Sequence, residues 1–90
     1  MKHTNHVTIH GEKIIKLFER FSHLLPSGVV EEGRDLISHG ENAIAHELLS
    51  QMLFEYSVHL KTRDFFDLQE SAILVGIDVV SLEFLRPLVY

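Results

Sequence analysis

The sequence predicts an all-α protein, a compact antiparallel helical bundle of four to five short helices. Apolar residues recur at steps of three and four along most of the chain, which is the spacing of one face of an α-helix. Gly40, Gly76 and two prolines divide these stretches into short segments with brief connections, as in a bundle. The 90 residues, 46% of them hydrophobic, are enough for one core.

The first helix is expected from Glu12 to Pro26, which ends it. Residues 1–11 are polar and are predicted to form a flexible lead-in, which leaves residues 12–90 as a single helical domain. The apolar positions of this helix fall on one face and are Ile14, Leu17, Phe18, Phe21, Leu24 and Leu25.

The second helix is expected to begin at Ser27, whose hydroxyl can cap free N–H groups. Its apolar set is sparse, and Gly33 weakens its middle. Those apolar residues are Val29, Val30, Leu36 and Ile37. Gly40 suits the left-handed residue that closes a helix, and Glu41 with Asn42 can open the next one immediately.

The third helix has the widest apolar stripe and is predicted to be the central packing element. The stripe comprises Ile44, Ala45, Leu48, Leu49, Met52, Leu53 and Tyr56. The ring of Tyr56 is expected in the core. The opposite side is polar and is expected to face solvent or a partner; it holds His46, Glu47, Ser50, Gln51 and Glu55.

The rest of the chain predicts a connector and two further helices. Residues 58–60 alternate briefly but have no convincing strand partner, so they are interpreted as a connector. Thr62 is expected to cap a fourth helix that ends at Gly76. Asp78 is expected to cap a short final helix, which Pro87 should end.

Composition excludes several classes of site. The chain has no cysteine, so disulfides, thiolate metal sites and thiol nucleophiles are ruled out. No secretory signal and no run of about 20 apolar residues is present, so we expect a cytoplasmic protein without a membrane partner. No cofactor is expected.

Charge is uneven along the chain. The net charge of -5 disfavours direct binding of nucleic acid. Residues 1–20 carry +2, residues 21–60 carry -5 and residues 61–90 carry -2. The acidic middle segment either steers the protein toward a basic surface or is a solvated face that maintains solubility.

Histidine patterns give little support for a metal site. His3, His6 and His10 would align on a helix, but their neighbours are poor helix formers, which favours a solvated tail. His46 and Glu47 begin like a metalloprotease motif, yet no second histidine follows one turn later.

Catalysis is not expected either. No serine–histidine pair has the strand–turn–helix context that exposes an activated hydroxyl. The carboxylates of Asp64, Asp67 and Glu70 share a predicted helical face, but acid–base catalysis also requires a water-shielded pocket. Protein binding is therefore the favoured function, through an acidic surface of the second and third helices. The candidate partner-binding residues are Glu31, Glu32, Asp35, Glu41, Asn42, Glu47 and Glu55.

Residues 36–49, LISHGENAIAHELL, followed by 53–55 and by the Gly-Ile-Asp turn at 76–78, resemble the MafI-type helical immunity proteins. The resemblance covers roughly residues 30–88. It implies an inhibitor of a polymorphic toxin delivered between neighbouring bacteria, often an RNA-cleaving nuclease. The acidic bias of the chain then predicts that the inhibitor covers the basic active-site surface of that nuclease. The resemblance also implies that Gly40 is a turn position and that Glu41 caps the helix or contacts the partner.

The alternative hypothesis is a helical adaptor or regulatory protein that acts as a dimer through an exposed apolar face. The high apolar content of so short a chain motivates it. An immunity protein can itself form a homodimer, so the two hypotheses overlap.

Overall fold

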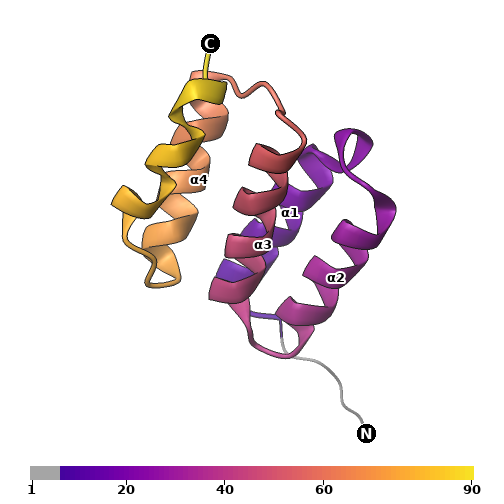
Figure 1. Ribbon diagram of the computed structural model, residues 1–90. Coiled ribbons are helices and arrows are strands. Elements are labelled where there is room, and N and C mark those ends of the chain that lie inside the picture. The colour runs from indigo at the N-terminus through magenta and orange to yellow at the C-terminus, as the bar shows by residue number, and fades with distance from the viewer. Residues whose placement is uncertain (1–6) are drawn as a thin grey trace, which may run out of the picture.

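The computed structural model describes residues 7–90, and over this range the protein is all-α, as predicted (Figure 1). Four α-helices and two 3-10 helices follow one another in the order α1 (Ile9–Arg20), η1 (Ser22–Leu24), α2 (Ser27–Ser38), α3 (Asn42–Glu55), α4 (Thr62–Leu74) and η2 (Val79–Leu88). Successive long elements run in opposite directions, so the bundle is antiparallel (Figure 1).

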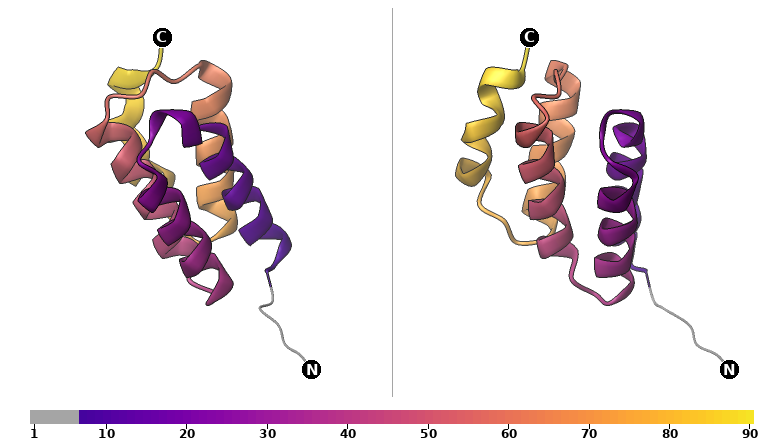
Figure 2. Two further views of the ribbon diagram at one scale, coloured as in Figure 1. Left: turned by 90° about the vertical axis from the view of Figure 1, so that its right-hand side faces the viewer. Right: turned by 45° about the vertical axis from the view of Figure 1, so that its right-hand side comes forward.

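The helices stack in three layers with α3 at the centre. Helices α1 and α2 form one layer, α3 and α4 form the next, and η2 covers the far side (Figure 2). Helix α3 packs against α1, α2, α4 and η2, which confirms its predicted central position. No helix of residues 7–90 is both long enough and apolar enough to cross a membrane.

Three helices end in the same hydrogen-bonded turn, in which a left-handed residue closes the helix. Gly40, with φ of 79°, closes α2, and Gly76, with φ of 83°, closes α4, as predicted. Ser57 occupies the equivalent position after α3 with φ of 48°. There the Val58 N–H donates to the Leu53 carbonyl at 3.0 Å. A serine in this conformation is strained because its Cβ crowds the backbone.

Both ends of α1 differ from the prediction. The helix begins at Ile9 and not at Glu12, because the Thr8 hydroxyl caps it by accepting a hydrogen bond from the Gly11 N–H at 3.0 Å. Residues 9–11 therefore belong to the folded domain and not to the lead-in. At its other end, α1 stops at Arg20, and the chain continues to Leu25 through η1 instead of as one helix.

Two predicted N-caps are wrong by one position. Ser27 and Thr62 are each the first residue of their helices, and neither side chain caps. At the start of α4, the Asp64 carboxylate instead accepts from the Lys61 N–H at 2.9 Å. The predicted cap at Asp78 is confirmed, since its carboxylate accepts from the N–H two residues later at 3.0 Å.

The last element is a ten-residue 3-10 helix, and the prediction that Pro87 ends it is wrong, because Pro87 lies inside it. The connector before α4 pairs with the end of this segment through one isolated bridge. The Leu60 N–H donates to the Leu88 carbonyl at 2.9 Å, and the Tyr90 N–H donates to the Leu60 carbonyl at 3.1 Å. The connector prediction holds, and the C-terminal residues supply the pairing that the sequence did not reveal.

Core residues come from every layer. Fully buried side chains include Phe18 on α1, Ile37 on α2, Leu49 on α3 and Leu85 on η2. The Phe18 ring packs directly against the backbone of Gly33, where a Cβ would overlap the ring. Gly33, which the sequence marks only as a weak point of α2, is therefore a close-approach site between α1 and α2.

Candidate functional site

A groove of about 270 Å³ runs between α3 and the C-terminal segment. Helix α3 contributes one wall, and the turn after α4 together with η2 contributes the other. The lining residues are His46, Glu47, Ser50, Gln51, Ile77, Ser81, Leu82 and Phe84. We call this feature the α3–η2 groove.

The inner side of the groove is polar although it is buried. His46 is fully buried and Ser50 is 3% exposed. His46 Nε2 lies 2.9 Å from the Leu68 carbonyl oxygen, and a carbonyl can only accept, so Nε2 carries the hydrogen. Nδ1 is then an acceptor, and Ser50 Oγ lies 3.5 Å from it, at the outer limit of a hydrogen bond.

Burial lowers the pKa of His46 below its usual 6.5, and the Leu68 carbonyl opposes this effect only in part. The ring is therefore neutral at pH 7. Its hydrogen bond joins the centre of α3 to the backbone of α4, so the imidazole holds two layers of the fold together.

The positions of His46 and Ser50 correct the sequence prediction, which assigned both to the solvent face of α3. The helix is buried on more than its apolar stripe, because α4 and η2 cover a second flank next to it. Conversely, Tyr56 was expected in the core, but it follows the last turn of α3 and is 53% exposed.

Aromatic side chains lie at the mouth of the groove. Phe84 of η2 and Phe54 of α3 are 40% and 49% exposed, and their rings meet edge to face with centroids 5.5 Å apart. Glu47 and Gln51 are exposed on the adjacent face of α3. The groove thus combines a carboxylate, an exposed aromatic surface and buried polar groups, and the exposed aromatic surface is the feature that it shares with protein-binding surfaces.

The predicted partner-binding residues do not gather around one feature. Glu47 lines the α3–η2 groove. Glu41 and Asn42 line a separate, shallow hollow at the start of α3, together with Thr8 of the α1 cap. Glu55 lies at the opposite end of α3, roughly 20 Å from Glu41 along the helix axis at 1.5 Å per residue.

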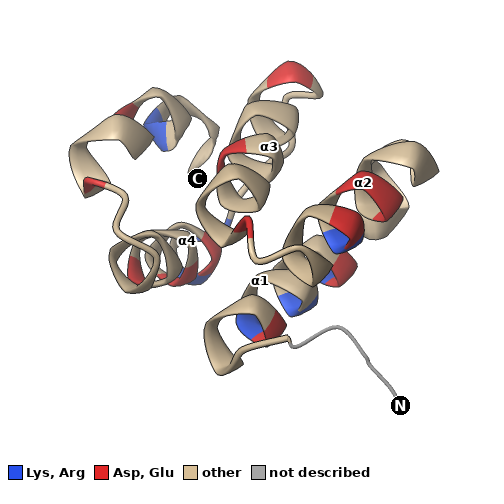
Figure 3. Cartoon of the chain, turned by 90° about the horizontal axis from the view of Figure 1, so that it is seen from below, with Lys and Arg blue, Asp and Glu red and all other residues tan. Residues whose placement is uncertain are grey.

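The acids of α2 form another surface. Glu31 and Asp35 stand one turn apart and opposite the buried Gly33 and Ile37, so they point away from the core. Glu32 is also exposed, on a flank of the same helix. Figure 3 shows that acidic positions occur on all layers of the bundle and are not gathered on one side.

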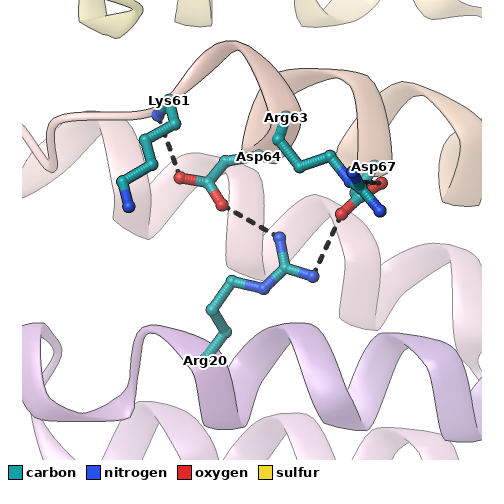
Figure 4. A network of polar contacts seen from close by, with 5 residues as sticks. All are labelled: Arg20, Lys61, Arg63, Asp64 and Asp67. Atoms are coloured by element: carbon teal, nitrogen blue, oxygen red, sulfur yellow. Dashed lines mark hydrogen bonds and ion pairs between the residues drawn. The ribbon is translucent and has the colours of Figure 1, made fainter.

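Two other carboxylates are engaged inside the fold (Figure 4). The Arg20 guanidinium on α1 lies 2.9 Å from Asp64 Oδ1 and 3.0 Å from Asp67 Oδ2 on α4. Asp64 also caps α4, and Arg63 approaches Asp67 at 3.8 Å. This network joins α1 to α4. Asp64 and Asp67 share one face of α4 because both bind Arg20 of the neighbouring helix.

The predicted histidine row lies mostly outside the described residues. His3 and His6 fall in the part of the chain that is not described, whereas His10 lies in the first turn of α1. Within residues 7–90, no group of three or more histidine, aspartate or glutamate side chains could hold a metal ion.

The chain matches no family model, no curated protein and no solved structure.

Proposed function

We propose that this protein is an immunity protein, which binds a toxin nuclease domain and neutralises it by covering its basic active-site surface. The observation that carries the proposal is the outer face of α3 at the α3–η2 groove. Here an exposed carboxylate, Glu47, lines the same groove as the half-exposed Phe84, whose ring contacts that of Phe54. Tight interfaces combine such an aromatic anchor with charge complementarity.

The sequence supports the specific form of the proposal. The resemblance to MafI-type immunity proteins spans α2, α3, α4 and η2, the elements that form the groove and the acidic surface of α2. The net charge of -5 favours rapid encounter with a basic nuclease cleft.

A growth assay tests the proposal. The protein is expressed in cells that carry the C-terminal domain of the toxin encoded directly upstream, and survival is scored together with isolation of the complex. Protection with a one-to-one complex is the expected result. Absence of both protection and binding would refute the immunity function.

Charge reversals then locate the interface. Glu47→Lys should abolish protection if the groove face is used, and Glu31→Lys with Asp35→Lys should do so if the outer face of α2 is used. Glu12→Lys, on the exposed side of α1, is the matched control. All four positions are exposed, so each variant is expected to fold, which circular dichroism checks.

A dimeric adaptor is the second candidate, because a different surface favours it. Phe66 and Ile73 stand two turns apart on the outer face of α4 and are 60% and 64% exposed. Val80, at the start of η2, is 70% exposed. Sedimentation over a wide concentration range tests this candidate. A dimer that Phe66→Ser dissociates would support it, and a monomer throughout would exclude it.

A further inference from the structure

We infer that the α3–η2 groove receives an arginine side chain from the partner. The inference rests on the proposed function for the partner's identity and on the groove itself for the chemistry. At about 270 Å³ the groove is smaller than the roughly 300–1,000 Å³ of small-molecule sites, so its size fits one inserted side chain.

The polar groups of the groove favour a cationic donor. Glu47 is the only lining residue with a formal charge, and it forms no ion pair with any other described residue. Gln51 and Ser81 are exposed at the groove, and Ser50 lies at its floor; each can supply an acceptor oxygen. A carboxylate flanked by acceptor oxygens favours a cationic ligand that brings several N–H groups.

Within the described residues, no Lys or Arg side chain of the protein itself lines the groove. Arg86 of η2 is the nearest cation in sequence, but it is engaged elsewhere. Its guanidinium binds Glu83 at 2.7 and 2.9 Å and lies 4.9 Å from the centroid of the Phe65 ring on α4. It therefore belongs to the face of η2 that covers α4 and not to the groove.

The apolar lining selects arginine over lysine. Ile77 and Leu82 can contact the methylene stem, and Phe84 offers an exposed ring surface. A planar guanidinium stacks on aromatic rings and binds a carboxylate through two N–H groups. The ammonium of lysine is a compact, strongly hydrated charge and is less suited to a half-buried, partly apolar groove.

The test uses the intact, isotope-labelled protein and three capped amino acids as probes. N-acetyl-arginine-methylamide should cause saturable amide shifts confined to residues 46–51 and 77–84. The lysine analogue should bind several-fold more weakly, and the neutral isostere citrulline should cause no saturable shift. Equal binding of lysine or citrulline, or shifts spread over all acidic surfaces, would overturn the inference.

Matched variants separate the groove from general attraction to acids. Glu47→Gln should weaken binding of the arginine probe about ten-fold, the effect of losing one charged hydrogen-bonded contact. Glu55→Gln, on the same helix but outside the groove, should leave it unchanged. An equal loss in both variants would contradict a specific site.

The two proposals fail in distinguishable ways. Protection against the toxin without probe binding would refute the arginine site and leave the immunity function standing. Probe binding without protection or complex formation would refute the immunity function and leave the chemistry of the groove intact.

Discussion

Replacement of Gly33 by alanine should destabilise the protein, although alanine is the better helix former. In an unobstructed helix the change would stabilise by about 1 kcal/mol. At this position, however, the added Cβ would lie 2.7 Å from both Cε atoms of Phe18 and closer still to Cζ. The ring is fully buried and cannot swing into solvent. Overpacking of this kind costs about 1–3 kcal/mol or more.

Because the added Cβ would overlap a fully buried ring, the cost should lie in the upper part of that range, at about 2–3 kcal/mol. Subtraction of the gain of about 1 kcal/mol in helix propensity leaves a net loss of about 1–2 kcal/mol. For a domain of this size that loss lowers the melting temperature by roughly 5–15 °C. Urea unfolding followed by circular dichroism should show a lower midpoint with an unchanged slope. Gly28→Ala is the matched control, because a Cβ added at Gly28 would have no neighbour within 4 Å. This variant should be neutral or stabilising.

A double variant isolates the contact itself. In a Phe18→Leu background the ring is absent, so Gly33→Ala should no longer be destabilising, and the two changes should couple by about 1 kcal/mol or more. If Gly33→Ala were as stable as the original protein, or if its cost were the same in both backgrounds, the close approach of α1 and α2 would be refuted.

Three further perturbations test other contacts. Stability should fall as pH drops below about 6.5, because the unfolded chain protonates His46 before the folded one does; His46→Gln should lose this slope in urea unfolding at several pH values. Arg20→Met should cost about 1 kcal/mol by removing the bridges to Asp64 and Asp67, and the difference should shrink in high salt. Ser57→Gly should stabilise by about 1 kcal/mol, measured by thermal unfolding, because it relieves the left-handed serine.

The Arg20 and Ser57 variants each have a control with no expected effect or the opposite one. The ion pair of Arg34 with Glu19 is half-exposed at both ends, so Arg34→Met should change stability by no more than about 0.5 kcal/mol. Ser38 is the last residue of α2 and does not have a positive φ, so Ser38→Gly relieves no strain and should destabilise. A Ser57→Gly variant that destabilised as Ser38→Gly does would contradict the strain argument. For His46, the slope should disappear only well above the usual pKa of 6.5, where the imidazole is neutral in both the folded and the unfolded state.

The helical architecture could be predicted because it depends on local signals. The spacing of apolar residues defined the helices, and Gly40 and Gly76 stand where a left-handed residue closes a helix. Helix starts were less predictable, because a hydroxyl or carboxylate can cap from several neighbouring positions. Thr8 caps a helix that was predicted to begin at Glu12, and Asp64 caps a helix whose predicted cap was Thr62.

The candidate site could not be predicted, because it depends on which helices meet. Periodicity identifies one apolar face of α3 but not a second neighbour that covers an adjacent flank. His46 and Ser50 therefore look like solvent-facing residues in the sequence, yet α4 and η2 bury them. The one hint was their spacing of four, which places both on one flank of a helix. Of the acidic residues predicted to bind a partner, only Glu47 lines the groove.

The 3-10 geometry of the C-terminal segment links the fold to the groove. A 3-10 helix rises about 2.0 Å per residue, so the ten residues of η2 span roughly 20 Å, close to the length of the fourteen-residue α3 beside it. Its period of three places Leu82 and Leu85 on one buried face and leaves Ser81 and Phe84 toward α3. An α-helix of ten residues would span only about 15 Å. The longer 3-10 helix therefore both covers the core over α3 and α4 and supplies the second wall on which the proposed arginine site depends.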